Sequence, residues 1–229
     1  MKIDRRLLIH FDWVLLFLVL LIALGGILNL YSTSQSLTSV GGKPLFMKQL
    51  YWLGVGLLVM GVTVAVDYRF MVRHAYWIYG GIIVLLILVL FFGTIANGSQ
   101  RWLSLGGLSL QPSEFVKIGL ILVLTRYITE NQIGEAYEIR NLIIPLGLVS
   151  VPVLLITRQP DLGTALFLVI LSFSIIFFIG VKRKALYIFA ATGMTLLPLF
   201  WLALKEYQRD RILTFFNPER DPLGTGYHI

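Results

Sequence analysis

The stretch Leu162-Gly-Thr-Ala-Leu-Phe-Leu-Val-Ile-Leu-Ser-Phe-Ser-Ile-Ile-Phe-Phe-Ile-Gly-Val181 contains no charged side chain. Because an α-helix rises about 1.5 Å per residue, a run of about 20 such residues crosses a hydrocarbon layer about 30 Å thick. The run is apolar on every side, whereas the strands of a membrane barrel alternate apolar and polar residues. It therefore predicts a membrane-spanning helix, and the sequence shows no strand pattern.

Six other apolar runs are separated by short charged breaks: Trp13–Tyr31, Leu50–Val66, Ala75–Ala96, Pro112–Leu124, Leu142–Ile156 and Ala185–Leu204. Of the 229 residues, 57% are hydrophobic and 14% are charged, whereas about 25% of residues are charged in an ordinary soluble domain. This composition excludes a water-soluble core. We therefore predict an all-α fold class, a polytopic membrane helix bundle of about seven helices, with residues 1–229 forming a single integral membrane domain.

The run Pro112–Leu124 is the weakest of these predictions. It is short and contains Glu114 and Lys117, so a soluble or re-entrant segment remains an alternative there. Small residues are expected to allow close helix packing at Gly25, Gly26, Gly54, Gly56 and Gly61. Prolines are expected inside helices at Pro145, Pro152 and Pro198.

The distribution of Lys and Arg between the short loops predicts the orientation in the membrane. With the amino terminus in the cytoplasm, ten basic residues lie in inner segments: Lys2, Arg5, Arg6, Arg69, Arg73, Arg126, Arg140, Lys182, Arg183 and Lys184. Five lie in outer segments: Lys43, Lys48, Arg101, Lys117 and Arg158. The net charge of +7 therefore indicates topology and contact with anionic membrane lipid, not nucleic-acid binding, because the basic residues form no stripe.

Several classes of chemistry are excluded by the residues that the chain lacks. The sequence contains no cysteine, so disulfide bonds and thiolate catalysis are excluded. The three histidines, His10, His74 and His228, are too scattered for a metal-site spacing. We assign no certain cofactor from the sequence, and a divalent cation remains possible.

A long outer loop is predicted from Asn97 to Leu110, and the segment Gln111-Pro-Ser-Glu-Phe-Val-Lys117 follows it. Proline is favoured in the first helical turn, and an acid there lies near the positive end of the helix dipole, so Glu114 is in part a helix-start carboxylate. Lys117 follows on the same face and can pair with Glu114. Because ionisable side chains facing lipid are costly, this pair is expected to point into the bundle or a wet cavity.

The segment Gln159-Pro-Asp-Leu-Gly-Thr164 places a second acid after Gln-Pro at a predicted outer helix start. Asp161 is either a helix cap or part of a site. Glu114 and Asp161 are expected to converge on one polar cavity near the outer surface, with Lys117, Arg101 and Arg158 nearby. Charges of both signs within a membrane indicate a functional site, here one for an anionic substrate.

Residues 205–229 follow the last predicted span. Their first part is amphipathic and basic, which is typical of an interfacial helix. Turn signals follow at Asn217-Pro218 and at Asp221-Pro-Leu-Gly224. A solvated surface loop is the alternative for this tail.

Five segments in these loops resemble the motifs of one family. They are Gly98-Ser-Gln-Arg-Trp-Leu103, Gln111-Pro-Ser-Glu-Phe-Val-Lys117, Gln159-Pro-Asp-Leu-Gly-Thr164, Tyr207-Gln-Arg-Asp-Arg-Ile212 and Asp221-Pro-Leu-Gly-Thr-Gly-Tyr-His228. In this order they resemble the SEDS family of shape, elongation, division and sporulation proteins, and most closely its rod-shape branch, RodA. The resemblance covers essentially the whole chain.

The resemblance implies a peptidoglycan glycosyltransferase of about ten helices in the bacterial cytoplasmic membrane. Such an enzyme polymerises lipid II into a growing glycan strand outside the membrane, and it works with a class B penicillin-binding protein. Carried over position by position, the resemblance implies substrate-side or structural roles for Glu114, Lys117, Asp161, Arg101 and Gln159.

No catalytic residue is assigned in this chain. Residues 205–229 would begin the large outer loop of the family, whose best-supported catalytic aspartate lies beyond the Tyr-His of the last motif. Residues 1–229 by themselves are therefore expected not to polymerise glycan.

Two other functions stay open at this point. A lipid II flippase or transporter would need a path open alternately to both sides, and the repeated Gln-Pro before an acid is weak support for an internal repeat. A non-catalytic membrane scaffold of the cell-wall machinery is the other alternative.

Overall fold

Long α-helices account for most of the chain, because a helix satisfies its backbone hydrogen bonds within one segment and so needs no water inside a bilayer. The computed structural model describes residues 11–35, 45–96, 99–105, 108–131, 136–204 and 206–216. The helices are α2 (Trp13–Gln35), α3 (Leu45–Ala65), α4 (Tyr68–Arg73), α5 (Ala75–Phe92), α6 (Pro112–Glu130), α7 (Ile139–Arg158), α8 (Leu162–Ile179), α9 (Arg183–Ala203) and α10 (Glu206–Phe216). Three short strands, β1 (Thr94–Ala96), β2 (Ser99–Leu105) and β3 (Leu108–Leu110), lie between α5 and α6.

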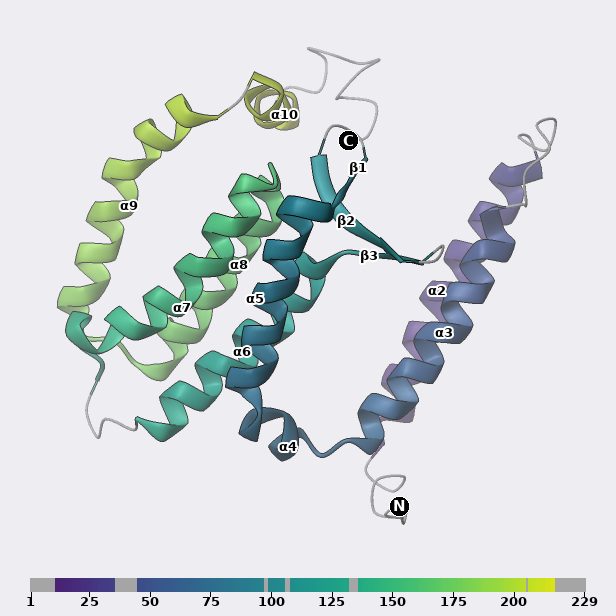
Figure 1. The fold of residues 1–229 in the computed structure, drawn as a ribbon, viewed down its shortest axis with the longest axis horizontal. Coiled ribbons are helices and arrows are strands. Elements are labelled where there is room, and N and C mark those ends of the chain that lie inside the picture. The colour runs from purple at the N-terminus through teal and green to yellow at the C-terminus, as the bar shows by residue number, and fades with distance from the viewer. Residues whose placement is uncertain are drawn as a thin grey trace. The chain divides into compact units, whose positions relative to one another are not determined.

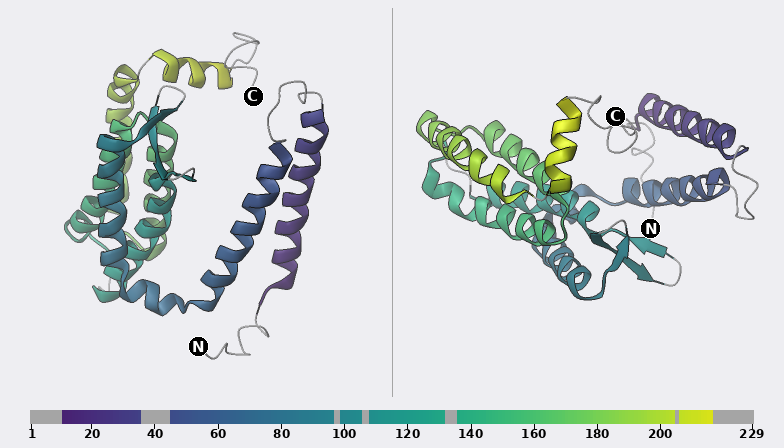
Figure 2. Two further views of the ribbon diagram at one scale, coloured as in Figure 1. Left: turned by 45° about the vertical axis from the view of Figure 1, so that its right-hand side comes forward. Right: turned by 90° about the horizontal axis from the view of Figure 1, so that it is seen from above.

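The chain divides into two compact units, residues 1–78 and 79–229. In the first unit, α2 and α3 lie side by side (Figure 2). Their spanning stretches bury no side chain within the structure, so these apolar surfaces need lipid or a partner to cover them.

Helix α6 is the most buried helix of the second unit, and it contacts α7, α8 and β2 (Figure 1). Its buried residues are Pro112, Ser113, Val116, Gly119, Leu120, Val123 and Leu124. Helices α7 and α8 pack against each other as well. Within this unit, the three strands and α10 lie at one end of the helices, and α7 and α9 begin at the other end (Figure 1).

Six helices among the described residues are long and apolar enough to cross a membrane: α2, α3, α5, α7, α8 and α9. This confirms the predicted polytopic helix bundle. The remaining predicted span, α6, is a continuous helix of 19 residues. It falls outside the set because of its charged residues, Glu114, Lys117, Arg126 and Glu130. Its crossing of the membrane therefore stays a prediction.

The prediction that the chain has no strands is wrong. Strand β2 pairs with β1 and with β3, antiparallel in both cases, to form a three-stranded sheet. The run predicted as one span from Ala75 to Ala96 accordingly ends as a helix at Phe92, and its last residues form β1. Asn97-Gly98 and Gly106-Gly107 link the paired strands, and these dipeptides favour tight hairpins.

The expectation of close packing at Gly25, Gly26, Gly54, Gly56 and Gly61 is wrong for the described residues. A Cβ atom added at each of these positions would meet nothing within 4 Å. The close approach occurs instead at Gly119 of α6, where an added Cβ would lie 2.6 Å from Cδ1 of Ile82 in α5. The prolines lie inside helices as expected, two in α7 and one in α9.

Two connections meet at the end of the second unit where α7 and α9 begin. Tyr137 and Val181 form a parallel β-bridge, in which Tyr137 N donates to Gly180 O at 3.0 Å and Lys182 N donates to Tyr137 O at 3.1 Å. Tyr137 is also buried against Leu142 and Ile176. The bridge therefore fixes the starts of α7 and α9 beside each other.

Candidate functional site

Arg101 and Asp161 meet at the end of the helices where the sheet lies. Arg101 is on β2, and its Nη1 atom is 3.6 Å from Oδ1 of Asp161. Its Nη2 atom donates a hydrogen bond to Pro160 O at 2.7 Å. At 3.6 Å the contact with the carboxylate is an ion pair without a hydrogen bond. The structure thus joins two of the predicted site residues across 60 positions of sequence.

Asp161 is also the N-cap of α8. Its Oδ1 atom accepts from Thr164 N at 3.2 Å, and its Oδ2 atom accepts from Thr164 Oγ1 at 2.9 Å. A capping carboxylate satisfies a free amide of the first turn and lies at the positive end of the helix dipole. The structure therefore confirms the helix cap and adds the contact with Arg101. That Asp161 is part of a substrate site stays a prediction.

The turn that carries Asp161 has an unusual backbone. Pro160 adopts a φ of +25°, whereas the proline ring favours a φ near −65°. Arg101 binds the carbonyl of this residue, and the Nε atom of Arg101 is buried without a hydrogen-bond acceptor in the described part of the chain. The Nε–H group is therefore an unsatisfied buried donor among the described residues.

Gln159 lies next to this turn but points into the protein. Its side chain is 2% exposed, and its Nε2 atom donates to Leu86 O in α5 at 3.1 Å. The contact links the end of α7 to the middle of α5. Of the two roles predicted for Gln159, the structure shows a structural contact, and a contact with substrate stays a prediction.

Glu114 and Lys117 form the second charged pair, as predicted from their spacing. Lys117 Nζ is 2.7 Å from Oε2 of Glu114, and it lies 5.4 Å from the ring centroid of Phe167 on α8. The Glu114 side chain is 54% exposed, whereas that of Asp161 is 7% exposed. Both pairs lie at the start of a helix, on α6 and α8, but a single cavity that holds both stays a prediction.

A pocket of about 400 Å³ lies beside the Arg101–Asp161 contact. It is lined by the end of α7, the turn before α8, and parts of α9 and α10: Thr157, Arg158, Pro160, Leu162, Phe200, Leu204 and Gln208. Arg158 supplies a positive charge, and Pro160 is the residue that Arg101 binds. Of the two alternatives for the tail, the structure shows a helix at its start, α10. Gln208 of this helix brings the Tyr207–Ile212 motif to the pocket.

Helix α10 is attached to the end of α9 through Arg209. Its Nε and Nη2 atoms donate to Trp201 O at 3.0 Å and to Leu202 O at 2.7 Å. Basic side chains commonly bind the last carbonyl groups of a helix in this way. The motif Asp221–His228 lies outside the described residues.

Two structural contacts were not predicted from the sequence. Gln100 Nε2 donates to Gly93 O at 2.8 Å, and it therefore holds the end of α5 against the sheet. Tyr79 Oη donates to Leu148 O at 2.7 Å, and it therefore joins α5 to α7. Gln100 is a polar residue in the Gly98–Leu103 motif, which was a sequence signal for the first contact. Tyr79 lies in an apolar run, where nothing in the sequence indicates the second contact.

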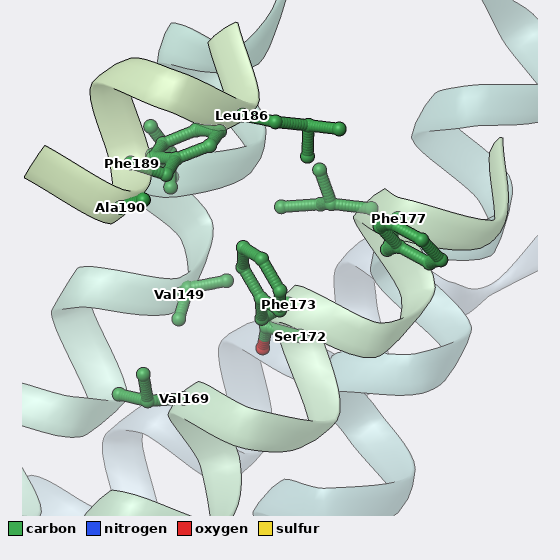
Figure 3. Close-up of a pocket in the computed structure, with 10 residues that line it drawn as sticks. Val149, Val169, Ser172, Phe173, Phe177, Leu186, Phe189 and Ala190 are labelled. Carbon is green, nitrogen blue, oxygen red and sulfur yellow. The ribbon is translucent and has the colours of Figure 1, made fainter. Parts of the chain in front are cut away.

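A second pocket, of about 490 Å³, is apolar and lies between α7, α8 and α9 (Figure 3). Phe173 and Phe177 of α8 and Leu186 and Phe189 of α9 line it. The hydroxyl of Ser172 donates to Leu168 O and so offers little to a ligand. Along α8 the nearest lining residue, Val169, is about 12 Å from Asp161 at 1.5 Å per residue. This pocket suits hydrocarbon and is separate from the charged site.

The chain is similar to proteins of bacterial cell-wall synthesis. A family model described as "Cell cycle protein", FTSW_RODA_SPOVE, matches residues 12–229. The peptidoglycan glycosyltransferase MrdB of Escherichia coli K12 is 32% identical over 224 residues, which cover 96% of this chain and 58% of that protein. A probable peptidoglycan glycosyltransferase FtsW of Trichlorobacter lovleyi is 33% identical over 227 residues, which cover 96% of this chain and 59% of that protein.

Solved structures agree with this similarity. The rod shape determining protein RodA of Thermus thermophilus aligns with a TM-score of 0.67 and 32% identity, covering 81% of this chain and 60% of that chain. A chain from the structure described as "Structural coordination of polymerization and crosslinking by a peptidoglycan synthase complex" aligns with a TM-score of 0.75 and 33% identity. The alignment covers 96% of this chain and 63% of that chain. The chain thus spans about three fifths of the length of these relatives.

Proposed function

Because this chain belongs to the FtsW, RodA and SpoVE family of cell cycle proteins, we propose that it forms the amino-terminal part of a peptidoglycan glycosyltransferase that polymerises lipid II. The relatives named above as peptidoglycan glycosyltransferases support this activity. The similarity to RodA supports a role in elongation and rod shape. We propose this activity for a protein that has the full length of its relatives, and not for residues 1–229 alone.

The observation that carries the proposal is the contact between Arg101 and Asp161 beside a pocket that contains Arg158. Lipid II carries a pyrophosphate, and preorganised cationic donors stabilise the negative charge that develops when such a group leaves. Arg101 has an unused buried donor within the described residues, and Asp161 holds its guanidinium in place. We assign these residues, with Glu114, Lys117 and Gln159, to the substrate side of the site or to its support.

Partners and location follow from the same premise. A class B penicillin-binding protein is the proposed partner, supported by the peptidoglycan synthase complex in which a similar chain occurs. The protein is polytopic, and the proposed location is the bacterial cytoplasmic membrane with the amino terminus inside. In this orientation the sheet, α10 and the Arg101–Asp161 contact face outward.

The test is the substitution Asp161→Asn in the protein of family length. Asparagine still caps a helix, but it removes the charge that faces Arg101. We expect lipid II polymerisation in proteoliposomes to fall by up to about 10²-fold, because Arg101 loses the carboxylate that orients it and loss of one preorganised donor costs about that much. The matched control is Asp67→Asn, because Asp67 is the N-cap of α4 and accepts from Arg69 N at 2.8 Å.

Equal activity of the Asp161→Asn variant and the wild type would contradict the proposal.

A lipid II translocation assay in vesicles without acceptor separates a flippase from a polymerase. A polypeptide of residues 1–229 is proposed to be inactive in the polymerisation assay, and capture of a penicillin-binding protein by this inactive form would support the scaffold alternative. Activity measured with and without EDTA tests the divalent cation.

A further inference from the structure

A third pocket, of about 360 Å³, lies at the end of the second unit opposite the sheet, where α7 and α9 begin. Its charged lining residues are Glu138, Arg140, Lys182 and Lys184, and its apolar lining residues are Ile139, Ala185 and Ile188. None of these residues belongs to the candidate site described above. The pocket therefore needs an explanation of its own.

The charge of this pocket is positive. Lys182 Nζ is 2.7 Å from Oε1 of Glu138, so one of its three cations is neutralised. The pKa of Glu138 lies below its ordinary value, because Lys182 hydrogen-bonds it and because the charges of Lys182, Arg140 and Lys184 act on it. All three cations therefore lie close to the Glu138 carboxylate. Within the described residues, Arg140 and Lys184 have no carboxylate partner of their own.

The backbone adds to the positive potential. Glu138 and Lys182 are the N-caps of α7 and α9, and neither makes a side-chain capping hydrogen bond. Two helix starts with free amides thus open beside the same pocket, and each carries the positive end of a helix dipole. The Tyr137–Val181 bridge holds these two starts together, so the arrangement is already formed before any ligand binds.

The position of the pocket indicates the kind of anion that it binds. The spanning stretches of α7 and α9 begin at Ile139 and Arg183, so the pocket lies at the boundary of the membrane. Within the first turns beyond it, Ile143, Tyr187 and Ile188 expose 63%, 72% and 41% of their surface. These side chains offer an apolar path for acyl chains directly next to the cations.

We propose that this pocket binds the phosphate headgroup of an anionic phospholipid, with its acyl chains along α7 and α9. Arg140 and Lys184 contact the phosphate oxygens, and the apolar wall of Ala185 and Ile188 faces the glycerol and the first methylenes. The bound lipid joins the starts of the two helices at the face opposite the candidate site. This inference does not depend on the proposed glycan chemistry.

The experiment measures binding of phosphatidylglycerol to the purified protein in phosphatidylcholine nanodiscs, by native mass spectrometry of the released complexes. The variant Arg140→Gln with Lys184→Gln removes two exposed cations. Each basic side chain near an anionic lipid surface contributes enough to shift binding severalfold, so we expect the double variant to bind about 20-fold more weakly. The variant Arg140→Lys with Lys184→Arg keeps both charges and is expected to retain binding.

The matched control is Arg69→Gln with Arg73→Gln on α4. It removes the same amount of charge from another segment that is predicted, like the pocket, to be cytoplasmic. It is expected to leave phosphatidylglycerol binding unchanged. Equal binding by the Arg140→Gln, Lys184→Gln variant and the wild type would overturn the proposal. Displacement of the lipid by an equal concentration of inorganic phosphate would overturn it in favour of a free anion, and preferential binding of a polyglutamate peptide would overturn it in favour of an acidic protein segment.

Discussion

At the scale of single residues, Asp161 combines two roles that a substitution can separate. It caps α8 through Thr164 and faces the guanidinium of Arg101. The sequence predicted the cap from Gln-Pro-Asp at a helix start, and it placed Arg101 in the same charged cluster. The direct contact between Arg101 and Asp161 could not be predicted, because it depends on strand β2, where a loop was expected.

We predict that Asp161→Ala destabilises the protein more than Asp161→Asn does. Loss of an N-cap costs about 1 kcal/mol, whereas asparagine replaces aspartate well in this position. Thermal unfolding of the two detergent-solubilised variants tests this, and the unfolding midpoint of Asp161→Ala is expected to be the lower one. If Asp161→Asn lowered the midpoint as much as Asp161→Ala, the ion pair and not the cap would account for the loss.

Glu138 provides a pH-dependent prediction. Its pKa is lowered from the ordinary value of 4.5, first by the hydrogen bond from Lys182. A carboxylate with a lowered folded-state pKa stabilises the fold above its unfolded pKa, and this contribution is lost as the pH falls through the folded-state value. We expect the carboxyl NMR signal of selectively labelled Glu138 to titrate below pH 4.5.

The variant Lys182→Met tests the cause of this shift, because it removes the hydrogen bond and the nearest charge together. The titration midpoint of Glu138 is expected to rise toward 4.5. An unchanged midpoint would mean that Arg140 and Lys184 account for the shift instead.

At the scale of secondary structure elements, the helices could be predicted because each apolar run has nearly the length of a span. The sheet could not, because its outer strands have only three residues each. The dipeptides Asn97-Gly98 and Gly106-Gly107 were the available signal for its two hairpins. Helix α6 was the uncertain span for a physical reason: its charges reduce its hydropathy, while the protein itself buries its apolar face.

Gly119 allows the prediction that a larger side chain fits there only if the Ile82 side chain moves. Gly119→Leu is expected to destabilise the protein by about 1–3 kcal/mol through overpacking against Ile82. Adding Ile82→Ala makes room, so the double variant is expected to lose less than the sum of the two single changes. A double-mutant cycle of unfolding midpoints measures this coupling.

The matched control is Gly147→Leu on α7, where an added Cβ meets nothing within 4 Å. Leucine has a higher helix propensity than glycine, so this change is expected to be neutral or stabilising. Equal losses at both positions would show that the effect is not one of packing between α5 and α6.

At the scale of the whole molecule, the composition was sufficient to predict a polytopic membrane protein. The division at residue 78 was not predicted, because it depends on which apolar surfaces meet and not on how apolar they are. The contact of Gln159 with Leu86 is another feature that the sequence did not predict. It joins residues that are distant in sequence through a backbone carbonyl, which carries no sequence signal.

The orientation of the chain gives a whole-molecule prediction. Because the sequence contains no cysteine, each introduced thiol reports alone. We expect Ser104→Cys on β2 to react with a membrane-impermeant maleimide in intact cells, and Asn131→Cys at the end of α6 to react only after permeabilisation. The reverse pattern would overturn the orientation that the Lys and Arg distribution predicts.

The attachments at the two ends of α8 have a mechanical consequence. Arg101 holds the turn before this helix, and Tyr137 binds the backbone just after it. A helix fastened at both ends behaves as a stiff rod, here about 27 Å long for its 18 residues. A displacement of the sheet along this axis is therefore expected to reach the Tyr137–Val181 bridge at the other end of α8.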